Sequence, residues 1–145
     1  ALRRNRQRGM ADNFLLEVVT PHRLVLSQEV EEMTAPGVEG EFGVLSGHTP
    51  FFTTLKVGDL MYRAGKEEGH MAVTWGFVEV LSDRVTILAE AAELAPEIDV
   101  ERAKRARERA EKRLKQLSPE DKEFYSSMAA LERAMNRITV SSRRR

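Results

Sequence analysis

The sequence has 145 residues, of which 41% are hydrophobic and 32% are charged, with 23 basic and 23 acidic side chains. This length suits one compact domain, or a small domain with an appendage. The absence of cysteine excludes disulfides and thiolate chemistry. The longest uncharged stretches are too short and too polar to cross a bilayer.

A basic leader, "ALRRNRQRG", precedes the first apolar stretch. Glu17 interrupts the following residues before an apolar core of signal-peptide length forms, so no signal peptide is expected. We expect the native chain to start at Met10. Residues 1–12 are therefore expected to be disordered or to lie outside the native chain.

Residues 13–94 are predicted to form an all-β domain. "FLLEVVT" is the first expected strand, and "HRLVLSQEVEEMTAP" alternates apolar and polar side chains. Hairpin turns are expected near Gly65 to Gly69 and at Ser82 to Arg84. The stretch Trp75-Gly76-Phe77 is expected in the core, with a close backbone approach at its glycine. Closely spaced short strands predict a sandwich or a barrel.

The periodicity changes after "AAELAPEID", where Pro96 ends the last extended segment and Asp99 is placed to cap a helix. A helix is predicted over residues 100–117, and its narrow apolar face consists mainly of alanine. Ser118-Pro119-Glu120-Asp121 then predicts the start of a second helix. The second helix carries apolar residues at the spacing of a seam for a partner helix: Phe124, Met128, Leu131, Met135 and Ile138.

A tight connection between these helices predicts an antiparallel two-helix hairpin over residues 95–140, followed by a basic tail at 141–145. An alanine-lined face buries little apolar area, so the hairpin is expected to be only marginally stable alone. A bound ligand or a change of partner would then suffice to move the two helices.

The segment "EIDVERAKRARERAEKRLKQL" carries eight basic residues and three glutamates after Asp99. A solvated helix face is one explanation, because each glutamate has a basic residue four positions later. Nucleic-acid binding is a second explanation. The neutral overall charge and the lack of aromatic residues in the segment argue against that second explanation.

A site for one small anion is the third explanation. Arg102 and Arg109 share one face of the first helix, and Arg133 and Arg137 share one face of the second. In an antiparallel hairpin these four guanidinium groups converge, and guanidinium binds phosphate bidentately. Beside them, a nucleotide would find carboxylate acceptors, an aliphatic contact and space for a flat ring at Glu93, Ile98, Asp99 and Ala103.

No catalytic set and no metal site is expected. Ser46 and His48 lie two apart in a turn with no acid placed to orient the histidine, which is expected to bond to backbone instead. His22, His48 and His70 lack metal-ligand spacing. The glycines of "GVEGEFGVLSG" have neither the lysine of a P-loop nor a strand-to-helix context, and are expected in turns.

Three stretches resemble the epsilon subunit of the bacterial F-type rotary ATP synthase, over residues 14–140. They are "VVTPHRLVLSQEVEEMTAPGVEGEFGVLSGHTPFF", "WGFVEVLSDRVTILAEAAE" and "ERAMNRITV". The chain departs from the family pattern at Ser46-Gly47, at Trp75, where a glycine is usual, and in the basic leader.

The resemblance implies a β-sandwich rotor-docking domain followed by a helical regulatory hairpin, without chemistry of its own. The implied partners are the gamma subunit and the ring of c subunits of a proton-translocating enzyme. The implied location is peripheral, on the cytoplasmic face of the bacterial inner membrane. In some members the hairpin extends, wedges against the catalytic beta and alpha subunits and blocks ATP hydrolysis. An acidic beta-subunit surface would attract the basic first helix.

The resemblance also implies ATP as a regulatory ligand, with no other cofactor. Some members bind ATP in the contracted hairpin through a motif that matches Ile98, Asp99, Arg102 and Ala103 here. The further implied positions are Glu93, Arg109, Arg133 and Arg137. ATP would hold the hairpin down, and its loss would free the helices. The alternative function is a free-standing nucleotide- or nucleic-acid-binding module that uses the basic helix.

Overall fold

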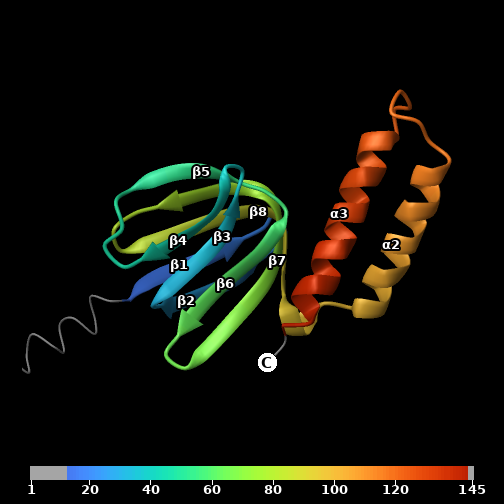
Figure 1. The fold of residues 1–145 in the computed structure, drawn as a ribbon. Helices are drawn as coiled ribbons and strands as arrows, with labels where there is room; N and C mark the ends of the chain where they lie inside the picture. Colours follow the sequence, from blue (N-terminus) through green and yellow to red (C-terminus); the bar gives the residue numbers. More distant parts are fainter. Residues whose placement is uncertain (1–12, 144–145) are drawn as a thin grey trace, which may run out of the picture.

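The computed structural model describes residues 13–143, so the predictions for the leader and for Arg144 and Arg145 lie outside the described residues. The chain forms a β-sandwich that is followed by an antiparallel two-helix hairpin, as predicted (Figure 1). The strands are β1 (Phe14–Val19), β2 (Leu24–Val30), β3 (Glu32–Gly37), β4 (Gly40–Leu45), β5 (Phe51–Leu55), β6 (Gly58–Ala64), β7 (Glu67–Val80) and β8 (Arg84–Leu94). A short 3₁₀ turn, η1 (Ala95–Glu97), leads into α2 (Val100–Lys115) and α3 (Phe124–Ser141).

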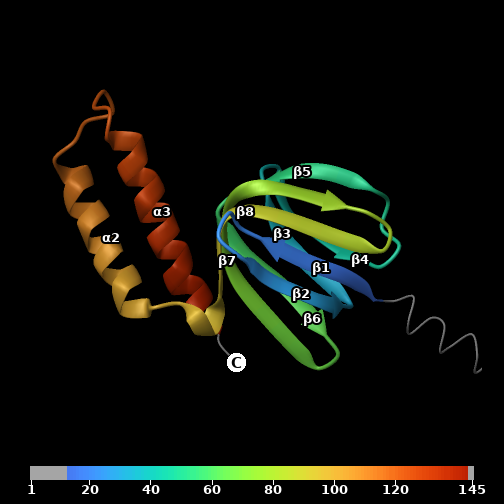
Figure 2. The ribbon, with the colours of Figure 1, turned by 180° about the vertical axis from the view of Figure 1, so that it is seen from behind.

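The strands pair in the order β2-β1-β8-β7-β5-β3-β4, and β6 joins β3 to β7. Strands β1 and β8 run parallel, and the other pairs are antiparallel. Alternate side chains point inward, since Leu16, Val18, Val85 and Ile87 are fully buried. Seen from behind in Figure 2, β1 and β2 cover the side of the sandwich away from β5. The core of the sandwich is therefore complete without the hairpin.

Strand β7 is long enough to belong to two parts of the sandwich. Its first half pairs with β6 up to Val73, and its second half pairs with β5 from Gly76 onward. At the bend Trp75 has a φ of 32°, and a Cβ on Gly76 would lie 1.9 Å from the Leu88 carbonyl oxygen. The close approach at Gly76 is confirmed. The prediction that this stretch lies in the core is wrong for Trp75 and Phe77, which are exposed because they face outward at the bend.

The glycine-rich stretch, predicted to form turns, contains strand β4. Gly47 does occupy a turn, and Gly40 begins β4 directly after a turn, with φ values of 78° and 125°. Gly43, however, lies within β4 and pairs with Thr34. Strand β4 forms because it pairs along β3. The local glycine pattern does not predict this pairing.

The first helix begins as predicted. The Asp99 side chain accepts a hydrogen bond from the backbone N–H of Arg102, at 3.1 Å, and so satisfies one free donor at the start of α2. We expect Asp99→Ala to lower the free energy of unfolding by about 1 kcal/mol. Urea unfolding followed by helical circular dichroism checks this value, and Asp99→Asn, which keeps a capping oxygen, serves as the control.

The second helix begins later than predicted, at Phe124. The Asp121 side chain does accept from the Ser118 backbone N–H at 2.8 Å, as a capping residue would. Successive bonds from Asp121 N–H to Ser118 C=O and from Phe124 N–H to Asp121 C=O instead close two turns. The first four-residue helical bond starts at Ser127. The prediction that Ser118 caps the second helix is therefore wrong, because these side-chain and backbone bonds close the interhelical turn.

The hairpin contacts the sandwich almost entirely through α3, which touches β7, β6 and η1, whereas α2 packs on α3. A small apolar cluster fills the junction and consists of Ala72, Ala95, Ile98 and Val140. Met128 and Met135 of the predicted seam stay about half exposed, so α2 does not cover that seam. Neither helix has the length and apolar character that a membrane crossing needs, among the residues described.

Candidate functional site

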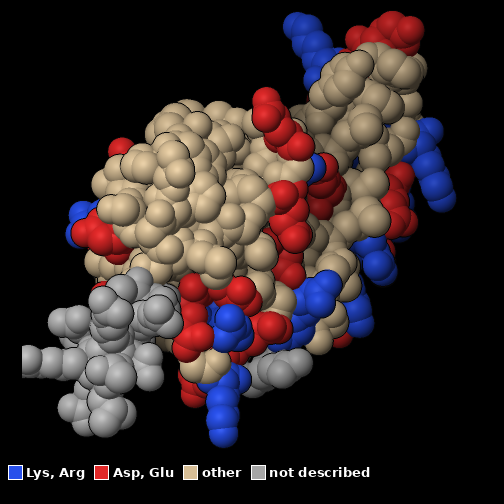
Figure 3. All heavy atoms as spheres, turned by 60° about the vertical axis from the view of Figure 1, so that its left-hand side comes forward, with Lys and Arg blue, Asp and Glu red and all other residues tan. Residues whose placement is uncertain are grey.

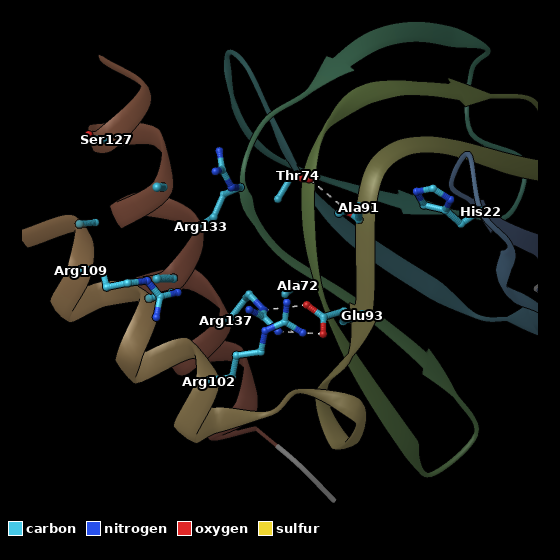
Figure 4. Close-up of a pocket in the computed structure, with 14 residues that line it drawn as sticks. His22, Ala72, Thr74, Ala91, Glu93, Arg102, Arg109, Ser127, Arg133 and Arg137 are labelled. Carbon is cyan, nitrogen blue, oxygen red and sulfur yellow. Dashed lines mark hydrogen bonds and ion pairs between the residues drawn. The ribbon is translucent and has the colours of Figure 1, made fainter. Parts of the chain in front are cut away.

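A cleft of about 870 Å³ lies between the hairpin and the sandwich, within the size range of ligand pockets (Figure 4). Its walls come from α2, α3, β7 and β8, together with the turn that joins β1 to β2. Its lining consists of His22, Ala72, Thr74, Ala91, Glu93, Arg102, Ala106, Arg109, Ala110, Ser127, Ala130, Arg133, Ala134 and Arg137. Five of the eight predicted site residues are in this set.

The four predicted arginines converge on the cleft. All four line it: Arg102 and Arg137 reach toward Glu93, Arg109 extends from α2 toward α3, and Arg133 points away from these side chains, on the sandwich side of α3 (Figure 4). The walls between them are largely alanine, which leaves room for a ligand while adding little polar competition. Four cations in one cleft favour a multiply charged anion, because the anion relieves their mutual repulsion.

Glu93 and Arg137 form an ion pair inside the cleft. Arg137 Nη2 donates to Glu93 Oε2 at 3.1 Å, and Arg137 Nε lies 2.7 Å from Glu93 Oε1. The Nε atom is buried and makes no hydrogen bond in spite of this short distance, so the second contact is electrostatic. The pair connects α3 to β8 and orients the Arg137 guanidinium within the cleft.

The other three predicted residues do not line the cleft. Ile98 is 2% exposed and packs in the apolar cluster at the junction. Asp99 caps α2, and Ala103 is a fully buried residue of the first turn of that helix. Since α2 packs on α3, the small side chain of Ala103 lets the two helices approach closely. These three residues set the position of α2 and hence of Arg102.

No sequence pattern predicts that four further residues line the cleft. Thr74 and Ala91 face each other across β7 and β8, and Ser127 and His22 come from distant parts of the chain. The Thr74 hydroxyl donates to the Ala91 carbonyl at 3.5 Å. Only the strand register and the docking of the hairpin bring them together.

A second ion pair crosses the hinge beside the cleft. Arg23 Nη2 donates to Glu97 Oε2 at 2.6 Å and joins the β1–β2 turn to η1. This hydrogen bond and the charge of Glu97 raise the pKa of Arg23 above its ordinary value. Both side chains are well exposed, so the pair steadies the hinge only modestly.

The predicted ion pairs between each glutamate of α2 and the basic residue four positions later do not form in the described chain. Other ion pairs form instead. Within the described chain Glu101 pairs with Lys104 and Glu111 with Arg107, each at 3.6 Å. These are exposed pairs of small energetic value. Arg113, near the end of α2, pairs with Glu123 just before α3.

One histidine prediction concerns a backbone contact. His48 lies 2.7 Å from the Thr49 carbonyl oxygen, so it bonds to backbone as predicted. Between residues 13 and 143 no group of three or more His, Asp or Glu side chains is arranged to hold a metal ion.

An apolar patch lies on the sandwich near the bend in β7. It comprises five exposed side chains: Val38, Phe52, Trp75, Phe77 and Leu88. The Phe52 and Phe77 rings stack with their centroids 5.6 Å apart, and Trp75 is held at a strained positive φ. Exposed aromatic clusters of this kind mark surfaces that bind other proteins.

Charge is divided between the two parts of the chain. Residues 13–94 carry 13 acidic and five basic side chains, whereas residues 100–115 carry eight basic and three acidic ones. Figure 3 shows acidic side chains gathered along the border of the sandwich with the hairpin, and basic side chains along the hairpin beside them. The docked hairpin therefore lies in an attractive field.

Comparison with known proteins agrees with this arrangement. Residues 13–95 match the family model "ATP synthase, Delta/Epsilon chain, beta-sandwich domain", and residues 97–142 match the "long alpha-helix domain" of the same chains. The ATP synthase epsilon chain of Geotalea uraniireducens is 55% identical over 134 residues, which cover 92% of this chain and 97% of that one. The epsilon chain of Geobacter sulfurreducens is 52% identical with the same coverage.

Solved structures show the same fold. A chain in the Euglena gracilis mitochondrial ATP synthase superposes with a TM-score of 0.75 at 28% identity, over 86% of this chain and 79% of that one. A chain in the central stalk and c-ring of the Tetrahymena thermophila enzyme has a TM-score of 0.56 at 13% identity, over 88% of this chain and 96% of that one, and supports the fold alone. The sandwich, the hairpin and these relatives together show that the chain belongs to the family of ATP synthase epsilon chains, which are subunits of a multi-subunit enzyme.

Proposed function

We propose that this chain is a non-catalytic central-stalk subunit that couples the gamma subunit to the c-ring of a proton-translocating ATP synthase. In this proposal the helical hairpin regulates ATP hydrolysis, and ATP in the cleft favours the contracted hairpin. The chain would lie peripherally on the cytoplasmic face of the bacterial inner membrane. The observation that carries the regulatory part is the convergence of Arg102, Arg109, Arg133 and Arg137 on one cleft beside Glu93.

The chemistry of the cleft suits a nucleoside triphosphate. Arginine binds phosphate oxygens bidentately, and four arginines match the several charges of a triphosphate. Glu93 offers carboxylate oxygens to an amino group or a ribose hydroxyl, and the alanine walls leave space for a flat base. Ile98, Asp99 and Ala103 contribute by holding α2 in place.

A ligand in this cleft would stabilise the docked hairpin by mass action. It would contact α2, α3 and β8 at once, so it would bind the contracted form and lose most contacts in any other. At a concentration of 100 times its Kd, such a ligand adds about 2.7 kcal/mol to the docked state. Among the described residues the apolar junction consists of four buried side chains, so a contribution of that size would shift the position of the hairpin markedly.

The released hairpin would present two surfaces to new partners. Its basic α2 face suits an acidic surface on the catalytic beta subunits, with the alpha subunits nearby. The exposed Met128 and Met135 border an apolar groove on α3, together with Phe124 and Leu131. A helix of the stalk or of a catalytic subunit would cover that groove in the extended, inhibitory form.

The apolar patch on the sandwich would dock on the gamma subunit. We expect Trp75→Ala and Phe77→Ala each to weaken binding to immobilised gamma subunit by roughly tenfold to thirtyfold, because central aromatic side chains dominate such interfaces. Tyr125→Ala is the matched control, since Tyr125 is 69% exposed but lies on α3. Equal affinity in all four proteins would reject the patch as the docking surface.

The same experiment separates the alternative function. A free-standing nucleic-acid-binding module would bind short duplexes with an affinity that falls steeply with salt, and the gamma subunit would not retain it. The excess of acidic side chains on the sandwich opposes such binding.

A further inference from the structure

A polar cluster outside the cleft also joins the hairpin to the sandwich. Near the end of α3, Asn136 Nδ2 donates to the Gly58 carbonyl oxygen at 2.9 Å. Just beyond the helix, Arg143 Nε lies 3.0 Å from Asp59 Oδ2. Both contacts reach the first two residues of β6, and Val140 is fully buried between them in the apolar junction. The end of α3 is thus fastened at a place where the nucleotide cleft does not extend.

Asp59 is held ready for this contact by a histidine. His70 Nδ1 lies 3.1 Å from Asp59 Oδ1 and 3.0 Å from Asp59 Oδ2, and His70 Nε2 lies 2.9 Å from Glu68 Oε2. The His70 side chain is only 9% exposed, so its ring cannot turn away into solvent. The aspartate therefore loses little rotational freedom when Arg143 approaches, which strengthens an ion pair of this kind.

We propose that Gly58, Asp59, His70, Asn136 and Arg143 form a latch, the β6 latch, that keeps the end of α3 docked whether or not the cleft holds a ligand. Because α2 packs mainly on α3, while α3 makes the main contacts of the hairpin with the sandwich, α2 and the tip of the hairpin can leave the cleft while the latch stays closed. The latch sets how often the whole hairpin undocks in the absence of nucleotide.

The latch can be measured through thiol reactivity, because the chain has no cysteine of its own. Two single-cysteine reporters, Val140→Cys on α3 and Ala95→Cys in η1, place a thiol on either side of the junction and outside the cleft lining, where Val140 is 0% and Ala95 is 1% exposed. N-ethylmaleimide reacts with these thiols only when the junction opens, so the labelling rate follows the open fraction. The measurement uses the full chain without nucleotide, and its outcome is therefore independent of ATP binding.

We expect Asp59→Asn and Arg143→Gln each to raise the labelling rate of both reporters by roughly twofold to fivefold. The effect is modest because a partly exposed ion pair contributes little free energy. The double variant should react no faster than the faster single variant, because both changes remove one interaction. Asn136→Ala should raise both rates by a similar factor through loss of its bond to Gly58. Arg63→Gln is the matched control, since Arg63 pairs with Glu31 and Glu32 within the sandwich and should leave both rates unchanged.

Three results would overturn the latch. One is an unchanged rate in both Asp59→Asn and Arg143→Gln. Another is acceleration at Val140→Cys alone, which would mean that only the end of α3 frays. The third is an additive effect in the double variant, which would mean that the two residues act separately. Arg143 is half exposed, so Arg143→Gln keeps the test decisive even if a change at Asp59 disturbs folding.

Discussion

Replacing Arg137 by alanine is expected to weaken ATP binding to the isolated chain by roughly tenfold to a hundredfold, the range for loss of a charge-assisted hydrogen bond. The change removes a guanidinium from the cleft and also leaves Glu93 without its cationic partner. An unpaired carboxylate would then repel the phosphates. Isothermal titration calorimetry of the purified chain measures the affinity directly.

Arg109→Ala separates ligand binding from docking. Arg109 lines the cleft, but among the described residues it has no ion pair with the sandwich, so its removal should weaken ATP binding without loosening the hairpin. Arg102→Ala should act in the same direction. Arg105→Ala is the matched control, because Arg105 is an exposed residue of α2 outside the cleft lining. Absence of binding heat in the unsubstituted chain, or one affinity shared by all these variants, would reject the ATP proposal.

The sequence predicted the order and type of the main elements, because the signals for them are local. The change from strand to helix is marked by Pro96 and Asp99, which act through their own backbone and side-chain geometry. The turn at Gly65 and the close approach at Gly76 are likewise local demands on the backbone. Features of this kind need no knowledge of the partner strand.

Features that depend on distant partners were missed. Strand β4 forms because β3 offers it a complementary edge, and Trp75 faces solvent because β7 changes partners at that residue. The capping pattern at Ser118 to Asp121 is compatible with both a helix start and a tight turn. A turn forms here because the short connection between α2 and α3 must reverse the chain within a few residues.

The candidate site shows the same division. Helical spacing places Arg102 with Arg109 and Arg133 with Arg137, and the antiparallel hairpin then brings both pairs to one cleft. Helical spacing does not show that Ile98 and Ala103 are kept from a ligand. Both side chains are buried by packing against neighbouring residues. His22 and Thr74 reach the cleft only through the fold of the sandwich.

Removal of the hairpin is the second large effect that we expect. The sandwich keeps its own core and its apolar patch when the chain ends at Leu94, so the shortened subunit should still bind the rotor. It would lack α2 and α3, and with them the basic face and the apolar groove that we assign to inhibition. The enzyme should then hydrolyse ATP faster, and ATP concentration should no longer change the degree of inhibition.

The central claim is that the hairpin restrains hydrolysis. It is tested most directly by the ATP hydrolysis rate of the reconstituted synthase with either the full chain or the chain ending at Leu94, after retention of both forms on the gamma subunit has been verified. We predict a severalfold higher rate with the shortened chain, most clearly at low ATP, where the cleft is empty. Equal rates with both chains, each bound to the rotor, would contradict the regulatory role.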